Sequence, residues 1–254
     1  MTTPKGLDMN KEFIENAYKC GVEIDEATMD KLRDFYEILV ETNKSMNLTA
    51  ITEYEDVLYK HFLDSLLVIR ALKDAGFEKE AEAFEGAKIA DIGTGAGFPG
   101  IPLKICFPDI KITLVDSLNK RIRFIQETCG ELGLKGVTAV HGRSEELGRN
   151  PEYRDSFDFV LSRAVASMPV LAEYCMPFAK KGGMFIAYKA EGVENEAKEA
   201  EMAVKKLGGE IKKIIPVPLE GTEIVREFVI IKKIADTPKK YPRKAGNPAK
   251  EPLR

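Results

Sequence analysis

Long apolar runs and a signal-peptide core are both missing from this chain of 254 residues. A membrane-spanning helix needs about 20 consecutive apolar residues, and no stretch of the sequence approaches that length. The first ten residues, MTTPKGLDMN, contain no apolar segment of the kind that begins a secreted protein. We therefore expect a cytoplasmic protein with no membrane partner.

Cysteine and histidine are scarce and scattered. The four cysteines form no CxxC pair; they are Cys20, Cys106, Cys129 and Cys175. The two histidines, His61 and His141, do not form the paired spacing that is typical of a metal site. These patterns disfavour a disulfide framework and a structural zinc site. We predict buried, reduced thiols and no bound metal, and we assign neither histidine a catalytic role.

The net charge of −3 on its face argues against a nucleic-acid partner, but the charge is unevenly distributed. Residues 232–254 hold eight basic and two acidic residues, so this segment carries +6 and the rest of the chain −9. Four prolines among the basic residues favour an extended conformation. We therefore predict a basic arm at 235–254, in which Tyr241 is available to stack on a base or ribose. A disordered solubilising tail is the alternative.

A glycine-rich segment, KIADIGTGAGFPG at 88–100, is the most informative part of the chain. An apolar strand reaches Asp91, and glycines follow at 93, 95 and 97; a second strand then ends on Asp116. Glycine lets the backbone approach a ligand without a Cβ in the way, and ligands bind at the carboxyl ends of strands in an open α/β sheet. We predict that Asp116 accepts hydrogen bonds from two ribose hydroxyls of an adenosine-containing cofactor.

Two other interpretations of this segment have to be weighed. The pattern GxGxxG does occur, at 95, 97 and 100, and would indicate a dinucleotide-dependent oxidoreductase. However, that GxGxxG pattern begins several residues later than a dinucleotide-binding loop would, and it contains Pro99. The carboxylate of Asp91 beneath the loop is also unsuited to an anionic pyrophosphate. A carboxylate there suits the ammonium and sulfonium of S-adenosylmethionine instead, so we favour this cofactor. The remaining alternative is that the glycine-rich segment is only a tight connection between a strand and a helix.

The rest of the sequence predicts the fold class. Residues 10–85 are mostly helical by their three- and four-residue apolar spacing. Strands and helices alternate from residue 88, which indicates a largely parallel sheet. The strands expected are 88–92, 111–116, 136–140, 157–162, 182–188, 211–217 and 225–233. The helices expected among them are 99–106, 118–132, 167–180 and 193–207.

The loop between the last two strands is too short for a parallel crossover, so these strands should pair antiparallel. The prediction is an α/β, Rossmann-like class I methyltransferase fold: a seven-stranded, mostly parallel sheet with an antiparallel C-terminal strand, preceded by N-terminal helices. We divide the chain into a helical region (1–86), a cofactor-binding methyltransferase domain (87–234) and the basic arm (235–254).

The order of several motifs identifies a resemblance. NLTAI, HFLDSL, DIGTGAGFPGIPLKI, VDSLNKR, HGRSEE, SRAVA and TPKKYPRK follow one another over residues 43–254. In this the chain resembles the RsmG (GidB) family of small-subunit ribosomal RNA guanine-N7 methyltransferases. The resemblance implies S-adenosylmethionine as cofactor, and small-subunit (16S) ribosomal RNA or the assembled subunit as partner of a monomeric enzyme. Family members often carry Ala where this chain has Ser144; a backbone contact would survive that change. The cofactor-binding residues that the loop and the resemblance indicate are Gly93, Gly95, Phe98, Asp116, Ser144, Glu145 and Arg163.

Two sequence motifs of other methyltransferases are absent, which disfavours the methylation reactions that those motifs support. No DPPY or NPPY follows the fourth strand, where enzymes that methylate exocyclic amines carry it, and no cysteine has the TC or PC setting of cytosine-C5 enzymes. Guanine N7 carries an in-plane lone pair and needs no proton removed, so no catalytic residue is predicted. A methyltransferase of small molecules and a noncatalytic RNA binder remain as alternatives.

Basic residues in two places are the predicted RNA contacts, although a solvated helix face is an equal possibility for the first group. They are Lys120, Arg121 and Arg123 in the second helix of the alternating region, and Lys239, Lys240, Arg243 and Lys244 in the arm. On this interpretation, removal of residues 235–254 should weaken RNA methylation and leave cofactor binding nearly intact.

Overall fold

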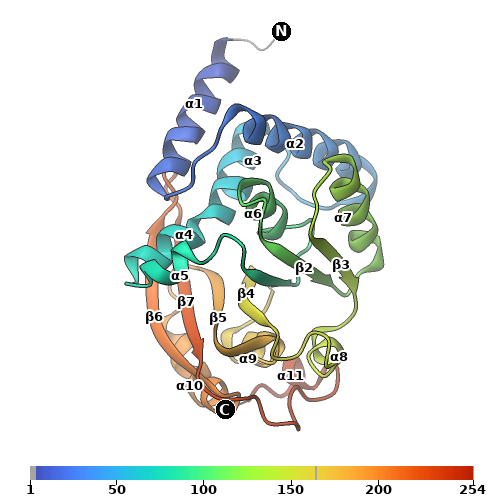
Figure 1. Cartoon of the computed structure of the whole chain (residues 1–254), viewed down its shortest axis with the longest axis vertical. Helices are drawn as coiled ribbons and strands as arrows, with labels where there is room; N and C mark the ends of the chain where they lie inside the picture. The colour runs from blue at the N-terminus through green and yellow to red at the C-terminus, as the bar shows by residue number, and fades with distance from the viewer. Residues whose placement is uncertain (1–3, 164, 254) are drawn as a thin grey trace.

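A seven-stranded sheet forms the centre of the molecule (Figure 1), in the order β3-β2-β1-β4-β5-β7-β6. The computed structural model describes residues 4–163 and 165–253. The strands are β1 (Lys88–Ile92), β2 (Lys111–Asp116), β3 (Val137–His141), β4 (Phe157–Arg163), β5 (Ala179–Ala190), β6 (Gly209–Pro218) and β7 (Val225–Lys233). The first five pair in parallel, whereas β7 is antiparallel to both β5 and β6. The predicted fold class and the C-terminal hairpin are confirmed.

Helices cover both faces of this sheet. Before the sheet come α1 (Pro4–Lys19), α2 (Glu26–Met46), α3 (Tyr54–Val57), the π-helix η1 (Leu58–Leu63), α4 (Asp64–Asp74) and α5 (Glu78–Glu82). Between and after the strands come α6 (Gly100–Cys106), α7 (Asn119–Glu131), α8 (Ser144–Leu147), α9 (Met168–Cys175), α10 (Glu194–Lys206) and α11 (Asn247–Lys250). Among the described residues, no helix is both long enough and apolar enough to cross a bilayer.

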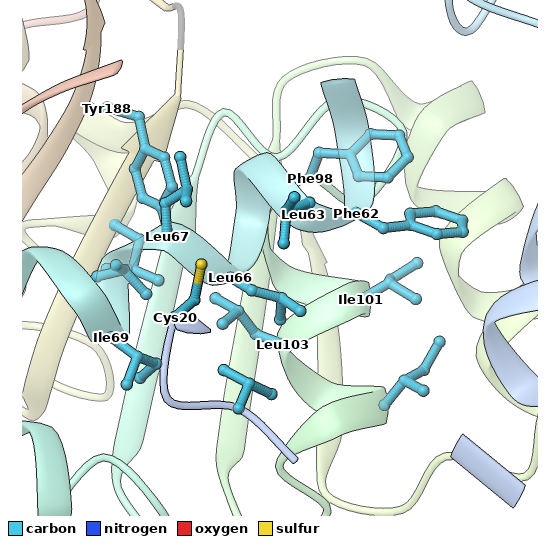
Figure 2. Close-up of a cluster of buried hydrophobic side chains, with 14 of the residues drawn as sticks. Cys20, Phe62, Leu63, Leu66, Leu67, Ile69, Phe98, Ile101, Leu103 and Tyr188 are labelled. Carbon is cyan, nitrogen blue, oxygen red and sulfur yellow. The ribbon is translucent and has the colours of Figure 1, made fainter. Parts of the chain in front are cut away.

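The buried side chains form two hydrophobic clusters. In the first, residues of α2, η1 and α4 pack with α6 and with one face of the sheet. Figure 2 shows part of it, where Leu66 and Leu67 of α4 lie near Leu103 of α6 and Tyr188 of β5. The N-terminal helices therefore share a core with the sheet. The second cluster contains α9 and α10 and reaches Tyr241 and Leu253 at the end of the chain.

Two expectations about local structure are wrong. The helix expected over 167–180 ends at Cys175, because Pro177 follows and Ala179 already begins β5. The unpacked arm expected at 235–254 is instead folded onto the body. Tyr241 is only 8% exposed and so is not free to stack on a base.

Candidate active site

A cleft lies at the carboxyl ends of β1, β2 and β4, where the strand order reverses. It consists of two cavities of about 450 Å³ and about 500 Å³. Gly93, Asp116, Ser117 and Val165 line both of them, so the two cavities are parts of one cleft. This is the place where the fold predicts a ligand.

The loop after β1 presents bare backbone to this cleft. Gly93 and Gly95 have φ angles of 75° and 62°, which L side chains rarely adopt. A Cβ on Gly93 would lie 2.5 Å from a methyl carbon of Val165, whereas a Cβ on Gly95 would meet nothing within 4 Å. The first glycine therefore leaves room for the loop after β4, and the second leaves open space above the backbone.

Asp116, at the end of β2, lies where the two cavities join. Its Oδ2 accepts hydrogen bonds from the Gly95 N–H at 3.0 Å and from Arg121 Nη1 at 3.2 Å, and its Oδ1 accepts one from the Leu118 N–H at 2.8 Å. These contacts fix the carboxylate at the wall of the cleft. The predicted ribose contact is thus well placed, and its role stays a prediction.

Asp91 does not face the cleft, and the expectation that it meets a cofactor's ammonium or sulfonium is wrong. The residue is fully buried and lines neither cavity. Its Oδ2 accepts hydrogen bonds from Thr94 Oγ1 at 2.7 Å and from the Gly100 N–H at 3.0 Å, while Oδ1 has no partner among the described residues. Burial raises its pKa to about 7. Asp91 therefore fixes the ends of the glycine loop.

The smaller cavity is bounded by α8 and by an apolar surface. Ser144 and Glu145 of α8 line it opposite Ile92, Val115 and Val170. Glu145 is 4% exposed. Apolar side chains beside a polar helix start suit a flat heterocycle whose edge carries donors and acceptors.

The larger cavity is bounded by an aromatic stack. The His61 ring lies 4.4 Å from the Phe98 ring at an interplanar angle of 19°, and the Arg163 guanidinium lies 5.1 Å from the centre of Phe98. Arg163 also donates to Asp64 Oδ2 at 2.7 Å, and Arg226 donates to Asp64 Oδ1 at 2.7 Å. Asp64 is fully buried. This pairing holds Arg163 in place against the ring.

The hydrogen bonds of His61 define its tautomer. A guanidinium has no acceptor, so the contact of 3.3 Å between Arg163 Nη2 and His61 Nδ1 makes Nδ1 the acceptor. His61 Nε2 then carries the proton and donates to Thr49 Oγ1 at 2.8 Å. Burial, with a further contribution from Arg163, lowers the pKa of His61 to about 4. The ring is neutral at physiological pH.

The hydroxyl group of Thr49 is available as a hydrogen-bond donor. Its Oγ1 accepts from His61 and also from the Ile51 N–H at 3.0 Å, so the hydroxyl hydrogen points elsewhere. Thr49 lines the larger cavity. Sequence reasoning did not select His61 or Thr49 as site residues. The only signal was that both lie in motifs of the resemblance, NLTAI and HFLDSL.

Comparison with known proteins identifies the family. A family model described as "rRNA small subunit methyltransferase G" matches residues 28–223. "Ribosomal RNA small subunit methyltransferase G" of Alkaliphilus oremlandii is 48% identical over 250 residues, which is 98% of this chain and 100% of that protein. The protein of the same name from Lachnoclostridium phytofermentans is 46% identical over 244 residues, 96% of this chain and 97% of that protein. The chain belongs to the ribosomal RNA small subunit methyltransferase G family.

Solved structures agree on the fold. TrmN from Thermus thermophilus superimposes with a TM-score of 0.50 at 15% identity, over 70% of this chain and 53% of that one. A mutant of MtNAS superimposes with a TM-score of 0.53 at 13% identity, over 92% of this chain and 90% of that one. At such identities the likeness concerns the fold alone.

Membership of the family confirms the predicted enzyme class, a methyltransferase, and with it S-adenosylmethionine as the methyl donor. The cleft fits this cofactor. The backbone at Gly95 is open to a ligand, Asp116 offers a carboxylate to ribose hydroxyls, and the smaller cavity offers an apolar site beside Glu145. An oxidoreductase, one of the alternatives considered above, is not favoured.

The predicted RNA contacts belong to α7 and to the C-terminal segment, each of which supplies one residue, Arg121 and Ala249, to the lining of the cleft. On α7, Lys120 and Arg123 are exposed, whereas Arg121 is partly buried and bound to Asp116. In the C-terminal segment, the three lysines are exposed, but Arg243 is paired with Glu173. The structure thus gives Arg121 and Arg243 internal partners, and the exposed Lys120 also donates to the Met46 carbonyl at 3.2 Å. An RNA-binding role for any of these residues stays a prediction.

Proposed function

We propose that this methyltransferase modifies N7 of a guanine in small-subunit ribosomal RNA. The observation that carries the proposal is the near full-length match to relatives of that name, at 46–48% identity in the two proteins above. We also infer that it acts as a cytoplasmic monomer, on either free ribosomal RNA or the assembled subunit. A small-molecule substrate would leave the exposed lysines beside the cleft without a role.

The side chains around the larger cavity suit a reaction without a general base. S-adenosylmethionine supplies, when bound, a methyl group on an electron-poor sulfonium. Guanine N7 has a free lone pair, so the protein has only to orient the base and keep water out. Both nitrogens of His61 are already engaged, one with Arg163 and one with Thr49. The imidazole is therefore a positioning group and accepts no proton during the reaction.

We infer that the target base enters the larger cavity after leaving its stack in the RNA. Phe98 and Thr49 line this cavity, and Thr49 offers a hydroxyl donor. An acceptor such as guanine O6 could take this hydrogen bond and leave N7 free. Lys120 and Arg123 on one side and the lysines of the C-terminal segment on the other would hold the RNA backbone by charge.

The test is transfer of a labelled methyl group. The protein is incubated with methyl-labelled S-adenosylmethionine and small-subunit particles that lack their native methylations, and in parallel with the protein-free RNA. We expect label in the ribosomal RNA, confined to one nucleotide, in at least one of the two reactions. Label absent from RNA in both, with cofactor binding confirmed by calorimetry, would contradict the proposed substrate and leave the enzyme class intact.

A further inference from the structure

Contacts at several points hold residues 237–253 to the body of the protein. We define the C-terminal strap as residues 237–253. Thr237 Oγ1 accepts from the buried Lys233 Nζ at 2.7 Å and donates to the Leu207 carbonyl at 2.7 Å. Arg149 and Arg154 donate to four strap carbonyls, those of Thr237, Lys240, Tyr241 and Pro242. Tyr241 and Leu253, each 8% exposed, anchor the strap in the second hydrophobic cluster.

A charged pair fastens the middle of the strap to α9. Arg243 donates from Nε and Nη2 to both carboxylate oxygens of Glu173, the shortest of these bonds being 2.7 Å, and the Arg243 N–H donates to the same carboxylate at 2.7 Å. Glu173 is fully buried. A buried carboxylate without this partner would be strongly unfavourable, so the pair fixes the position of Arg243 against α9.

That position places the strap against the smaller cavity of the active site. The Gly246 N–H donates to Glu145 Oε1 at 2.8 Å, and Ser144 Oγ donates to the other carboxylate oxygen at 3.3 Å. Ala249 of α11 lines the cavity together with Tyr174 of α9 and Glu145 of α8. Figure 1 shows α8, α9 and α11 gathered at the same end of the molecule. The strap is therefore both a wall of the cavity and a partner of a residue in it.

We propose that the C-terminal strap is part of the cofactor site: it closes the adenosine end of the cleft and positions Glu145. The inference rests on the cofactor assigned above. Arg243 and Gly246 are positioning residues, since they act through Glu173 and Glu145. On this proposal, removal of residues 235–254 should weaken cofactor binding, contrary to the division of labour expected from the sequence.

The strap has two faces, and they allow separate tests. Its inner face carries Arg243, Gly246 and Ala249, which meet α9, α8 and the cavity. Its outer face carries the exposed Lys239, Lys244 and Lys250. Changes on the inner face should alter the affinity for the cofactor, whereas changes on the outer face should not.

The experiment compares three variants with the wild type by calorimetry. The first ends after Pro242 and carries Glu173→Gln, so that no unpaired carboxylate is left buried and Tyr241 stays in the core. The second carries Glu173→Gln alone. The third replaces Lys239, Lys244 and Lys250 by Ala. The ligands are S-adenosylmethionine and 5′-methylthioadenosine, which keeps the adenosine and lacks the amino-acid group.

We expect the Kd of the shortened variant to rise at least tenfold, by a similar factor for both ligands, because the removed segment borders the adenosine end of the cleft. The lysine variant should change each Kd less than threefold, whereas Glu173→Gln alone, which removes the charged partner of Arg243, should raise each Kd by less than the shortened variant does. An unchanged Kd in the shortened variant, or a weakening limited to S-adenosylmethionine, would overturn the inference. A wild type that binds neither ligand would instead contradict the cofactor assignment itself.

Hydrogen–deuterium exchange on the unmodified protein provides a second readout that needs no variant to fold. Addition of S-adenosylmethionine should slow exchange of the amides in 244–253 as well as those of the glycine loop. Slowing at the loop without any slowing in 244–253 would show that the strap does not take part in binding.

Discussion

A chain of hydrogen bonds beside the larger cavity links Asp64, Arg163, His61 and Thr49, and each of these side chains has a different role in it. Asp64 neutralises part of the charge of two arginines, Arg163 holds one nitrogen of His61, and His61 orients Thr49. The chain of contacts ends on a hydroxyl hydrogen at the cavity wall. Thr49, which lines the cavity together with His61 and Arg163, is the member of this network that we propose as a donor to the substrate.

Thr49→Val should separate base positioning from cofactor binding. The substitution keeps the shape of the side chain and removes its hydroxyl, which is a donor at the cavity wall and the acceptor of hydrogen bonds from His61 and from the Ile51 N–H. We expect methyl transfer in single turnover to slow by about 10- to 100-fold, which corresponds to about 1.4–2.7 kcal/mol of lost transition-state stabilisation. The Kd for S-adenosylmethionine should change less than twofold. Transfer at the wild-type rate would exclude Thr49 from the site.

His61 makes stability depend on pH in a defined direction. Its pKa is about 4 in the folded protein and 6.5 ordinarily, so between these values the unfolded chain binds more protons. Stability is then fully present above pH 6.5 and falls as pH is lowered toward 4, by at most about 3 kcal/mol. Asp91 works in the opposite direction, since its raised pKa stabilises the fold at low pH and that contribution disappears as pH rises through about 7.

His61→Gln isolates the first of these contributions. Urea unfolding at pH 7, 5 and 4 should show that the free energy of unfolding of the variant falls less between pH 7 and pH 4 than that of the wild type. The exposed His141, changed in the same way, serves as the control. Parallel pH profiles for wild type and His61→Gln would contradict the neutral, buried imidazole.

At the scale of elements, three loops and the strap build the cleft. The loops follow β1, β2 and β4, and the sequence predicted all three because each strand is a short apolar run that ends in glycine or a charged residue. Gly93, Asp116 and Arg163 therefore lie near their expected places. The strap was missed, because its partners Arg149, Arg154 and Glu173 lie at least 70 residues away in the chain. Composition alone made it look unpacked.

The pair between the strap and α9 should be strongly coupled. Arg243→Gln leaves the buried Glu173 carboxylate short of a charged partner, and we expect it to lower the free energy of unfolding by about 3 kcal/mol. Glu173→Gln added to it should restore a large part of that stability, as a double-mutant cycle in urea would show. The exposed pair Arg33–Asp30 is the matched control, and Arg33→Gln should cost less than about 1 kcal/mol. Additive effects of the two changes at 243 and 173 would contradict the coupling.

At the scale of the whole molecule, positive charge is concentrated in the C-terminal segment, whereas the rest of the chain is negatively charged. Residues 232–254 carry +6 while the rest carries −9. The fold brings this basic segment beside one cavity and the start of α7 beside the other. The sequence predicted the charge asymmetry but not which basic side chains have internal partners, since that depends on which acids the fold places nearby.

The exposed residues of α7 should determine the salt dependence of RNA binding. For single-stranded RNA, removing one phosphate-binding cation lowers the slope of log K against log salt by about 0.7. We therefore expect Lys120→Ala with Arg123→Ala to reduce the slope by about 1.4 in binding titrations between about 50 and 200 mM salt. The exposed Lys198 and Lys205 of α10, which line neither cavity, are the control. An unchanged slope in the α7 variant would show that RNA does not contact this helix.

The N-terminal helices illustrate a further limit of the sequence. Their apolar spacing predicted helices, but only the structure shows that η1 supplies His61 to the cleft and that α4 supplies Asp64, the buried partner of Arg163. Helix periodicity reports which face is buried and not which distant loop it meets. For this reason the cofactor half of the cleft could be predicted far better than the half that we assign to the base.

The most direct test of the account is the position of the methyl group. Borohydride reduces N7-methylguanosine in RNA, and aniline then cleaves the chain at that nucleotide. After incubation of unmethylated small-subunit particles with the protein and S-adenosylmethionine, we predict one new cleavage site at a guanine, absent when the Asp116→Ala variant is used. Methyl label in the RNA without such cleavage would place the methyl on another atom and contradict the account.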